Sequence, residues 1–78
     1  MANWNPDQVL DAKGLSCPMP ILKTKKIIKD MSPGQILEIR STDPGTRNDL
    51  PAFLSRSGDE LLGEEQGQGY ISFFVKKA

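Results

Sequence analysis

The sequence of 78 residues contains ten Lys and Arg residues against ten Asp and Glu residues, one cysteine and no histidine. A chain of this length is expected to fold as one small domain spanning residues 1–78. The neutral net charge argues against nucleic acid as the main partner, and the missing histidine excludes Cys–His pairs, Ser-His-Asp triads and most zinc sites.

Cys17 has no second cysteine with which to form an internal disulfide, so a free thiol is expected. The N-terminal residues MANWNPDQ lack the features of a signal peptide, and no apolar run is long enough to cross a membrane. We therefore expect a cytoplasmic protein in a reducing compartment, with no role for a membrane, a metal ion or a cofactor.

The N-terminal part of the sequence predicts a strand followed by an amphipathic helix. Gln8–Ala12 forms the strand, with Val9 and Leu10 as its apolar residues. Residues 18–31 have the helical period, and the Ser-Pro-Gly sequence at 32–34 ends the helix. The apolar side of this helix is formed by Ile21, Thr24, Ile27, Ile28 and Met31, and the opposite side by Leu22, Lys23, Lys25, Lys26 and Lys29.

A second strand and a second helix are predicted next. Gln35–Ser41 alternates between apolar and polar residues, as a strand does. The following helix has apolar residues at 50, 53 and 54 and ends near residue 57, with Gly58 as its C-terminal stop. Because proline is tolerated only in the first helical turn, Pro51 favours Asn48 as the N-cap.

The C-terminal residues predict two more strands, 59–66 and 70–77, joined by the Gly-Gln-Gly turn at 67–69. The resulting order, β-α-β-α-β-β, predicts a two-layer α/β sandwich in which two helices cover one face of a four-stranded mixed sheet. The other face stays uncovered, and Val9, Ile36 and Phe74 are expected to point toward it.

The motif that stands out is the cysteine with its two prolines, Cys17-Pro18-Met19-Pro20. Pro18 at the first helical position would make Cys17 the N-cap, and Pro20 is tolerated in the first turn. The positive end of the helix dipole favours the reactive thiolate over the thiol. The alternative is a buried cysteine that acts as a small hydrophobic residue.

The parallel β-α-β unit places the end of the second strand at the same sheet edge as Cys17. Ser41, Thr42, Asp43 and the loop 44–48 are expected near the thiol, and ligands of α/β sheets favour this edge. Asp43 and Arg47 are therefore candidates for docking a partner. The alternative for Asp43 is that it forms a turn with the proline that follows it.

The lysine-rich side of the first helix has two interpretations. It is either a solvated face or a docking face for an acidic partner. Lys23 and Lys26 lie farthest from the apolar stripe, and Leu22 is an apolar residue among the charges. Leu22 favours docking, although lysine stems could also cover it.

The sequence resembles the TusA/SirA family of small sulfur-carrier proteins. The shared motifs are Cys-Pro-x-Pro at 17–20, the lysine-rich helix around 23–29, Pro-Gly at 33–34, the strand at 35–41 and Asp-Pro at 43–44. The resemblance covers roughly residues 10–75 and implies the same two-layer sandwich.

The resemblance further implies that Cys17 accepts sulfane sulfur as a persulfide, with Gly14, Pro18 and Pro20 as supporting motif residues. The donor would be a cysteine desulfurase or a rhodanese-like protein. The acceptor would be another relay protein in tRNA thiolation, molybdenum cofactor assembly or sulfur oxidation. The protein would act as a monomeric sulfur carrier rather than as a turnover enzyme.

Carrier chemistry also agrees with the composition, because a second cysteine would discharge the carried sulfur as a disulfide. Two other functions stay open. One is a non-catalytic regulatory or interaction module that uses the basic helix or the open sheet face. The other is an RNA-binding domain, which only fold analogy suggests and which the neutral charge disfavours.

Overall fold

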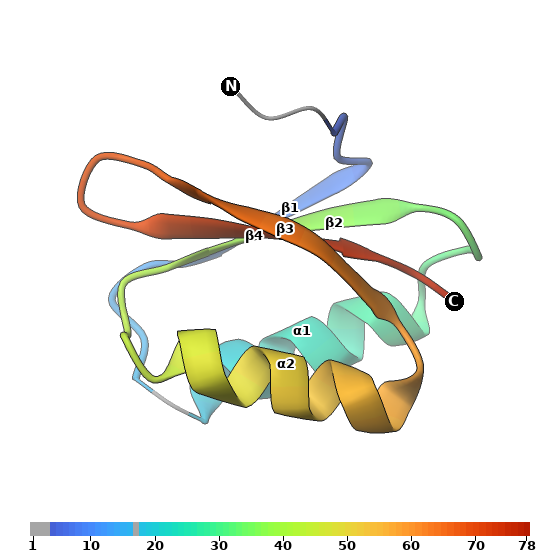
Figure 1. Ribbon diagram of the computed structural model, residues 1–78, viewed down its shortest axis with the longest axis horizontal. Coiled ribbons are helices and arrows are strands. Elements are labelled where there is room, and N and C mark those ends of the chain that lie inside the picture. The colour runs from blue at the N-terminus through green and yellow to red at the C-terminus, as the bar shows by residue number, and fades with distance from the viewer. Residues whose placement is uncertain (1–3, 17) are drawn as a thin grey trace.

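The computed structural model describes residues 4–16 and 18–78 (Figure 1). Its elements are β1 (Gln8–Ala12), α1 (Met19–Lys29), β2 (Ile36–Ser41), α2 (Thr46–Ser57), β3 (Glu60–Gln66) and β4 (Ile71–Lys76). The predicted order β-α-β-α-β-β and the four-stranded mixed sheet are therefore confirmed.

The sheet has the strand order β1-β2-β4-β3. β1 pairs with β2 in parallel, whereas β4 pairs antiparallel with both β2 and β3. The register of the parallel pair ends with Ala12 opposite Ser41, so both strands leave the sheet at the same edge. Figure 1 shows α1 and α2 side by side on one face of the sheet, as predicted.

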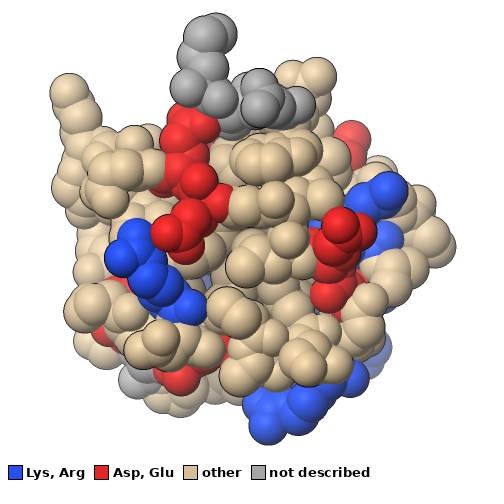
Figure 2. Space-filling model, in the orientation of Figure 1, with Lys and Arg blue, Asp and Glu red and all other residues tan. Residues whose placement is uncertain are grey.

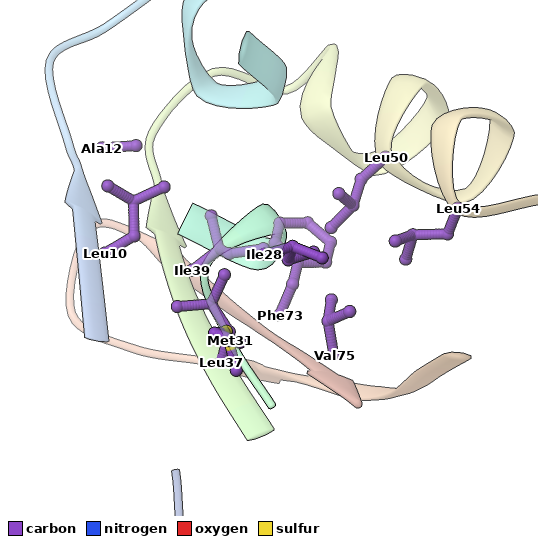
Figure 3. Packing of buried hydrophobic residues seen from close by; sticks show 10 residues of the cluster. All are labelled: Leu10, Ala12, Ile28, Met31, Leu37, Ile39, Leu50, Leu54, Phe73 and Val75. Atoms are coloured by element: carbon purple, nitrogen blue, oxygen red, sulfur yellow. The ribbon is translucent and has the colours of Figure 1, made fainter. Parts of the chain in front are cut away.

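The core lies between this helical layer and the sheet (Figure 3). It is built from Leu10, Ala12, Ile28, Met31, Leu37, Ile39, Leu50, Leu54, Phe73 and Val75. The strand residues alternate along their strands and the helix residues recur three or four positions apart, which confirms the predicted apolar faces. Each fully buried large side chain contributes roughly 1.5–3 kcal/mol of transfer free energy relative to an exposed one.

α1 is shorter than the helix predicted for residues 18–31. It begins at Met19, and its N-cap is Pro18, which the sequence placed at the first helical position. The N-cap role predicted for Cys17 is therefore wrong, and the cysteine itself lies outside the described residues. At the other end, Met31 follows the helix but is still buried in the core.

α2 begins at Thr46 with Gly45 as its N-cap, so the prediction of Asn48 as N-cap is wrong. Thr46 is fully buried, and its Oγ1 lies 2.8 Å from Oγ of Ser41, which ties the first turn of the helix to the end of β2. Pro51 consequently lies inside the helix. The predicted stop is confirmed, because Gly58 has a φ of 87° at the C-cap.

The open face of the sheet is partly covered by the N-terminal segment. The ring centroids of Trp4 and Phe74 are 5.1 Å apart. Phe74 is only 2% exposed, so its predicted exposure is wrong. Gly63 leaves room for the indole, since a Cβ there would lie 2.5 Å from Trp4 Cη2. Ile36 is half-buried, whereas Val9 is 49% exposed, as predicted.

A buried carboxylate lies on the same open face. Glu38 Oε2 accepts hydrogen bonds from Ser72 Oγ at 2.9 Å and from Arg40 Nε at 2.8 Å. This hydrogen bond and the charge of Glu38 raise the pKa of Arg40 above its ordinary value. Together the two hydrogen bonds satisfy the Glu38 carboxylate, which would be costly to bury alone.

Candidate functional site

The candidate site is at the sheet edge where β1 and β2 end together. The β1–α1 loop, which contains Cys17, leaves this edge next to the β2–α2 loop, because Ala12 and Ser41 are paired. A hydrogen bond from the Gly14 N–H to Thr42 Oγ1, at 2.9 Å, joins the two loops. These two residues are 28 positions apart in the sequence. The topological prediction that these loops lie together is correct for their described residues.

The β1–α1 loop opens with a tight turn. The Leu15 N–H donates to the Ala12 carbonyl at 3.2 Å, and Gly14 has a φ of 82°. A left-handed conformation at this position favours glycine, which gives Gly14 a physical role in the turn. Ser16 precedes Cys17 and Met19 follows it in the sequence, and the Met19 N–H donates to the Ser16 carbonyl at 2.9 Å.

The two motif prolines occupy different environments. Pro18 is exposed at the N-cap, and its carbonyl accepts the Leu22 N–H at 3.0 Å. Pro20 is buried in the first turn, and its carbonyl accepts a hydrogen bond from Thr24 Oγ1 at 2.8 Å. Neither proline removes a helical hydrogen bond, because first-turn N–H groups have no acceptor within the helix.

Asp43 shapes the β2–α2 loop. Its Oδ1 accepts the Gly45 N–H at 3.0 Å, its carbonyl accepts the Thr46 N–H at 3.1 Å, and its own N–H donates to Ser41 Oγ at 3.2 Å. These contacts are those of the turn-forming alternative. The loop also borders a hollow of about 170 Å³, which is lined by Ser41, Thr42, Asp43, Pro44, Gln66, Gly69, Tyr70 and Ile71.

Arg47 forms an ion pair between α2 and β3. Its Nη2 lies 3.0 Å from Glu64 Oε1 on β3, and both side chains are more than a third exposed. An ion pair this exposed contributes little to stability. Arg47 is therefore engaged with β3 in the structure, and a docking role would require it to exchange Glu64 for a partner's carboxylate.

The outer side of α1 is basic with apolar residues among the charges. α1 contains four lysines and no acidic residue, and Lys23 and Lys26 are exposed. Leu22 is 52% exposed and Met19, which the sequence analysis did not single out, is 42% exposed. Leu22 also borders a hollow of about 470 Å³ between the helices, lined by Ile21, Leu22, Lys25, Phe53, Arg56 and Ser57.

The acidic side chains gather elsewhere. β3 contains three glutamates and no basic residue. On the face shown in Figure 2, acidic and basic side chains are interspersed and no single sign of charge dominates. The net charge of zero therefore results from a basic helix, α1, and an acidic strand, β3, among other charges.

Two features of this edge were not assigned a role from the sequence. One is the hydroxyl of Thr42, which joins the two loops. The sequence signals it only by a threonine directly after the second predicted strand and a glycine shortly after the first. The other is the ring of Tyr70, with Lys13 Nζ at 5.0 Å and Arg40 Cζ at 5.7 Å from its centroid. These contacts join residues in or next to β1, β2 and β4, which only the fold brings together.

Among residues 4–16 and 18–78, no group of three His, Cys, Asp or Glu side chains could hold a metal ion. Within the same residues, neither helix has the length and apolar character needed to cross a bilayer.

Comparison with known proteins identifies relatives along most of the chain. The family model described as "Sulfurtransferase TusA" matches residues 8–77. The sulfur carrier protein TusA of Allochromatium vinosum is 46% identical over 72 residues, which are 92% of this chain and 95% of that protein. TusA of Pseudomonas putida (strain GB-1) is 36% identical over 77 residues, covering 99% and 96% of the two chains.

A solved structure supports the fold. The crystal structure of the SirA-like protein from Desulfitobacterium hafniense superimposes with a TM-score of 0.73 at 24% identity and covers 88% of this chain and 95% of that one. At this identity the likeness shows a shared fold.

Proposed function

Because the chain belongs to the sulfurtransferase TusA family, we propose that it is a sulfur carrier whose Cys17 holds sulfane sulfur as a persulfide. The observation that carries this proposal is the family match over residues 8–77, which includes the only cysteine of the chain. We propose that residues 1–78 form one such carrier domain, which works as a monomer in the cytoplasm.

The proposed transfer has two steps, each a thiol–persulfide exchange. The Cys17 thiolate attacks the outer sulfur of a donor persulfide, the donor's S–S bond breaks, and the donor leaves as a thiolate. An acceptor thiolate then attacks the outer sulfur of the Cys17 persulfide and regenerates the Cys17 thiolate. The sulfane sulfur is passed on with its oxidation state unchanged, so no external oxidant, reductant or cofactor is needed.

The structure supports this chemistry through the frame around the cysteine. The exposed Pro18 and the Gly14 turn hold the chain on either side of Cys17 at an open sheet edge rather than in the core. A persulfide relay needs partner access more than it needs a general base. The absence of a second cysteine from the sequence protects the carried sulfur from internal disulfide formation.

We propose that partners approach over α1. Its lysines provide opposite charge for an acidic partner, and the exposed Leu22 provides an apolar contact. A cysteine desulfurase or a rhodanese-like protein would be the donor, and another relay protein would be the acceptor. The final use of the sulfur would be tRNA thiolation, molybdenum cofactor assembly or sulfur oxidation, and the chain itself would bind neither nucleic acid nor membrane.

Mass spectrometry of the intact protein tests this function. After incubation with a persulfide-loaded donor, wild type should gain the mass of one sulfur atom, and the gain should disappear after treatment with a reductant. Peptide mapping should place it on Cys17. No gain with a desulfurase and with several rhodanese-like donors would contradict the carrier function and favour the non-catalytic interaction module.

A further inference from the structure

The side chain of Thr42 joins the β1–α1 loop to the β2–α2 loop at the candidate site. The paired register of β1 and β2 ends at Ala12 and Ser41. The Gly14 N–H, two residues beyond β1, donates instead to Thr42 Oγ1 at 2.9 Å. Both residues are exposed, whereas Leu15, which follows Gly14, packs against the core.

The hydrogen bond acts on a turn whose shape is already set. The Ala12 carbonyl and the Leu15 N–H close this turn at 3.2 Å, and Gly14, with a φ of 82°, has the conformation that a type II turn requires at its third position. The turn fixes the local path of the chain. The bond to Thr42 and the packing of Leu15 against the core orient that path relative to β2.

Thr42 is itself well placed to serve as an anchor. It is flanked by Ser41, whose Oγ is bonded to the buried Thr46 Oγ1 at 2.8 Å and also accepts the Asp43 N–H at 3.2 Å. The hydroxyl that receives Gly14 therefore belongs to a loop joined to the core through the first turn of α2. The Ser41–Thr46 hydrogen bond, the peptide link from Ser41 to Thr42 and the Thr42–Gly14 hydrogen bond thus connect the core to the loop that leads to Cys17.

We propose that Thr42 is a positioning residue for sulfur transfer. Its hydroxyl oxygen orients the β1–α1 loop so that the cysteine carried by this loop meets the sulfur of a docked partner. This inference rests on the proposed sulfur-carrier function. Transfer between two proteins depends on such orientation, because the reacting atoms must approach in line within a rigid complex, whereas a small reagent selects its own approach.

The test compares Thr42→Val with Thr42→Ser. Valine keeps the shape of threonine but removes the acceptor, and serine retains the acceptor. We expect protein-to-protein sulfur transfer to fall roughly three- to tenfold in Thr42→Val, the factor that corresponds to one hydrogen bond, and Thr42→Ser to restore most of the rate. Exchange of the Gly14 amide hydrogen should accelerate in Thr42→Val alone.

Alkylation of Cys17 by iodoacetamide separates positioning from a general loss of structure. Its rate and its pH midpoint should stay close to wild type in both variants, as should the thermal midpoint. If Thr42→Val transfers sulfur at the wild-type rate, Thr42 has no positioning role, and the carrier function is unaffected. Equal losses in Thr42→Val and Thr42→Ser would overturn the positioning role as well, and failure of wild type to accept sulfur would overturn both proposals.

Discussion

Single substitutions at Cys17 and at the residues beside it test the proposed sulfur-carrier function most directly. We expect Cys17→Ser to abolish sulfur loading while the thermal midpoint stays within a few degrees of wild type, because the proposed function requires an accessible cysteine and a surface substitution usually changes stability by less than about 0.5 kcal/mol. Intact mass and a thermal melt measure the two effects. A strongly destabilised Cys17→Ser variant would mean that the cysteine is a core residue, as in the alternative interpretation.

Pro18 tests whether the frame of the motif matters for transfer. Pro18→Ala frees the chain before α1 and should cost about 0.4–1 kcal/mol of stability through the unfolded state. Sulfur uptake measured with donor below saturation should fall by more than this change in stability explains. Pro33→Ala is the matched control, because Pro33 is also exposed but lies in the turn between α1 and β2. Equal uptake rates in the two variants would assign Pro18 to folding alone.

At the scale of elements, the basic side of α1 is the proposed docking face. Replacing Lys23 and Lys26 with glutamate should lower the transfer rate without unfolding, because these exposed side chains steer an acidic partner. The wild-type rate should fall as salt rises, since the Debye length is only about 8 Å at physiological ionic strength. The variant should start low and respond weakly to salt.

The control for this pair is the same charge change elsewhere. Lys76 lies at the end of β4 opposite Ile36, at the sheet edge away from Ser41, and Lys77 follows it. Lys76→Glu with Lys77→Glu should transfer sulfur almost as fast as wild type. If both double variants are slowed equally, net charge rather than the α1 face governs the rate.

The N-terminal segment and β3 form a second pair of elements that can be tested. Gly63→Ala should destabilise the protein by about 1–3 kcal/mol, because the added Cβ would lie 2.5 Å from the Trp4 ring. Trp4→Ala removes that obstacle, so Gly63→Ala should cost much less in the Trp4→Ala background. Urea unfolding of the four proteins measures the coupling, and additive effects would show that Trp4 does not pack against Gly63 in solution.

The whole molecule shows which features a sequence pattern can predict. Alternation along 71–75 and the three-or-four spacing of α1 depend on neighbouring residues, and they predicted the strands and the buried faces. The start of α2 was missed because local chemistry favoured Asn48, whereas the buried pair of Thr46 and Ser41 extends the helix backward. Helix starts depend on such tertiary contacts as well as on propensity.

The candidate site also has features that the sequence predicted and features that it did not. The edge at which the two loops meet followed from the parallel β-α-β topology, and the turn formed by Asp43 was among the alternatives considered. The Thr42–Gly14 hydrogen bond and the Arg47–Glu64 ion pair link residues far apart in the sequence, and no periodicity reveals them. Coverage of Phe74 by Trp4 was missed for the same reason.

The contact between Trp4 and Phe74 provides an optical probe that needs no label. Trp4 is the only tryptophan of the chain, and it contacts Phe74 on the sheet face opposite the one that packs against α1 and α2. A partner that occupies this open face has to displace or cover the indole and so change its emission, whereas a partner docked on α1 leaves the indole in place. With a tryptophan-free partner, fluorescence would therefore report which face of the sandwich each member of a sulfur relay uses.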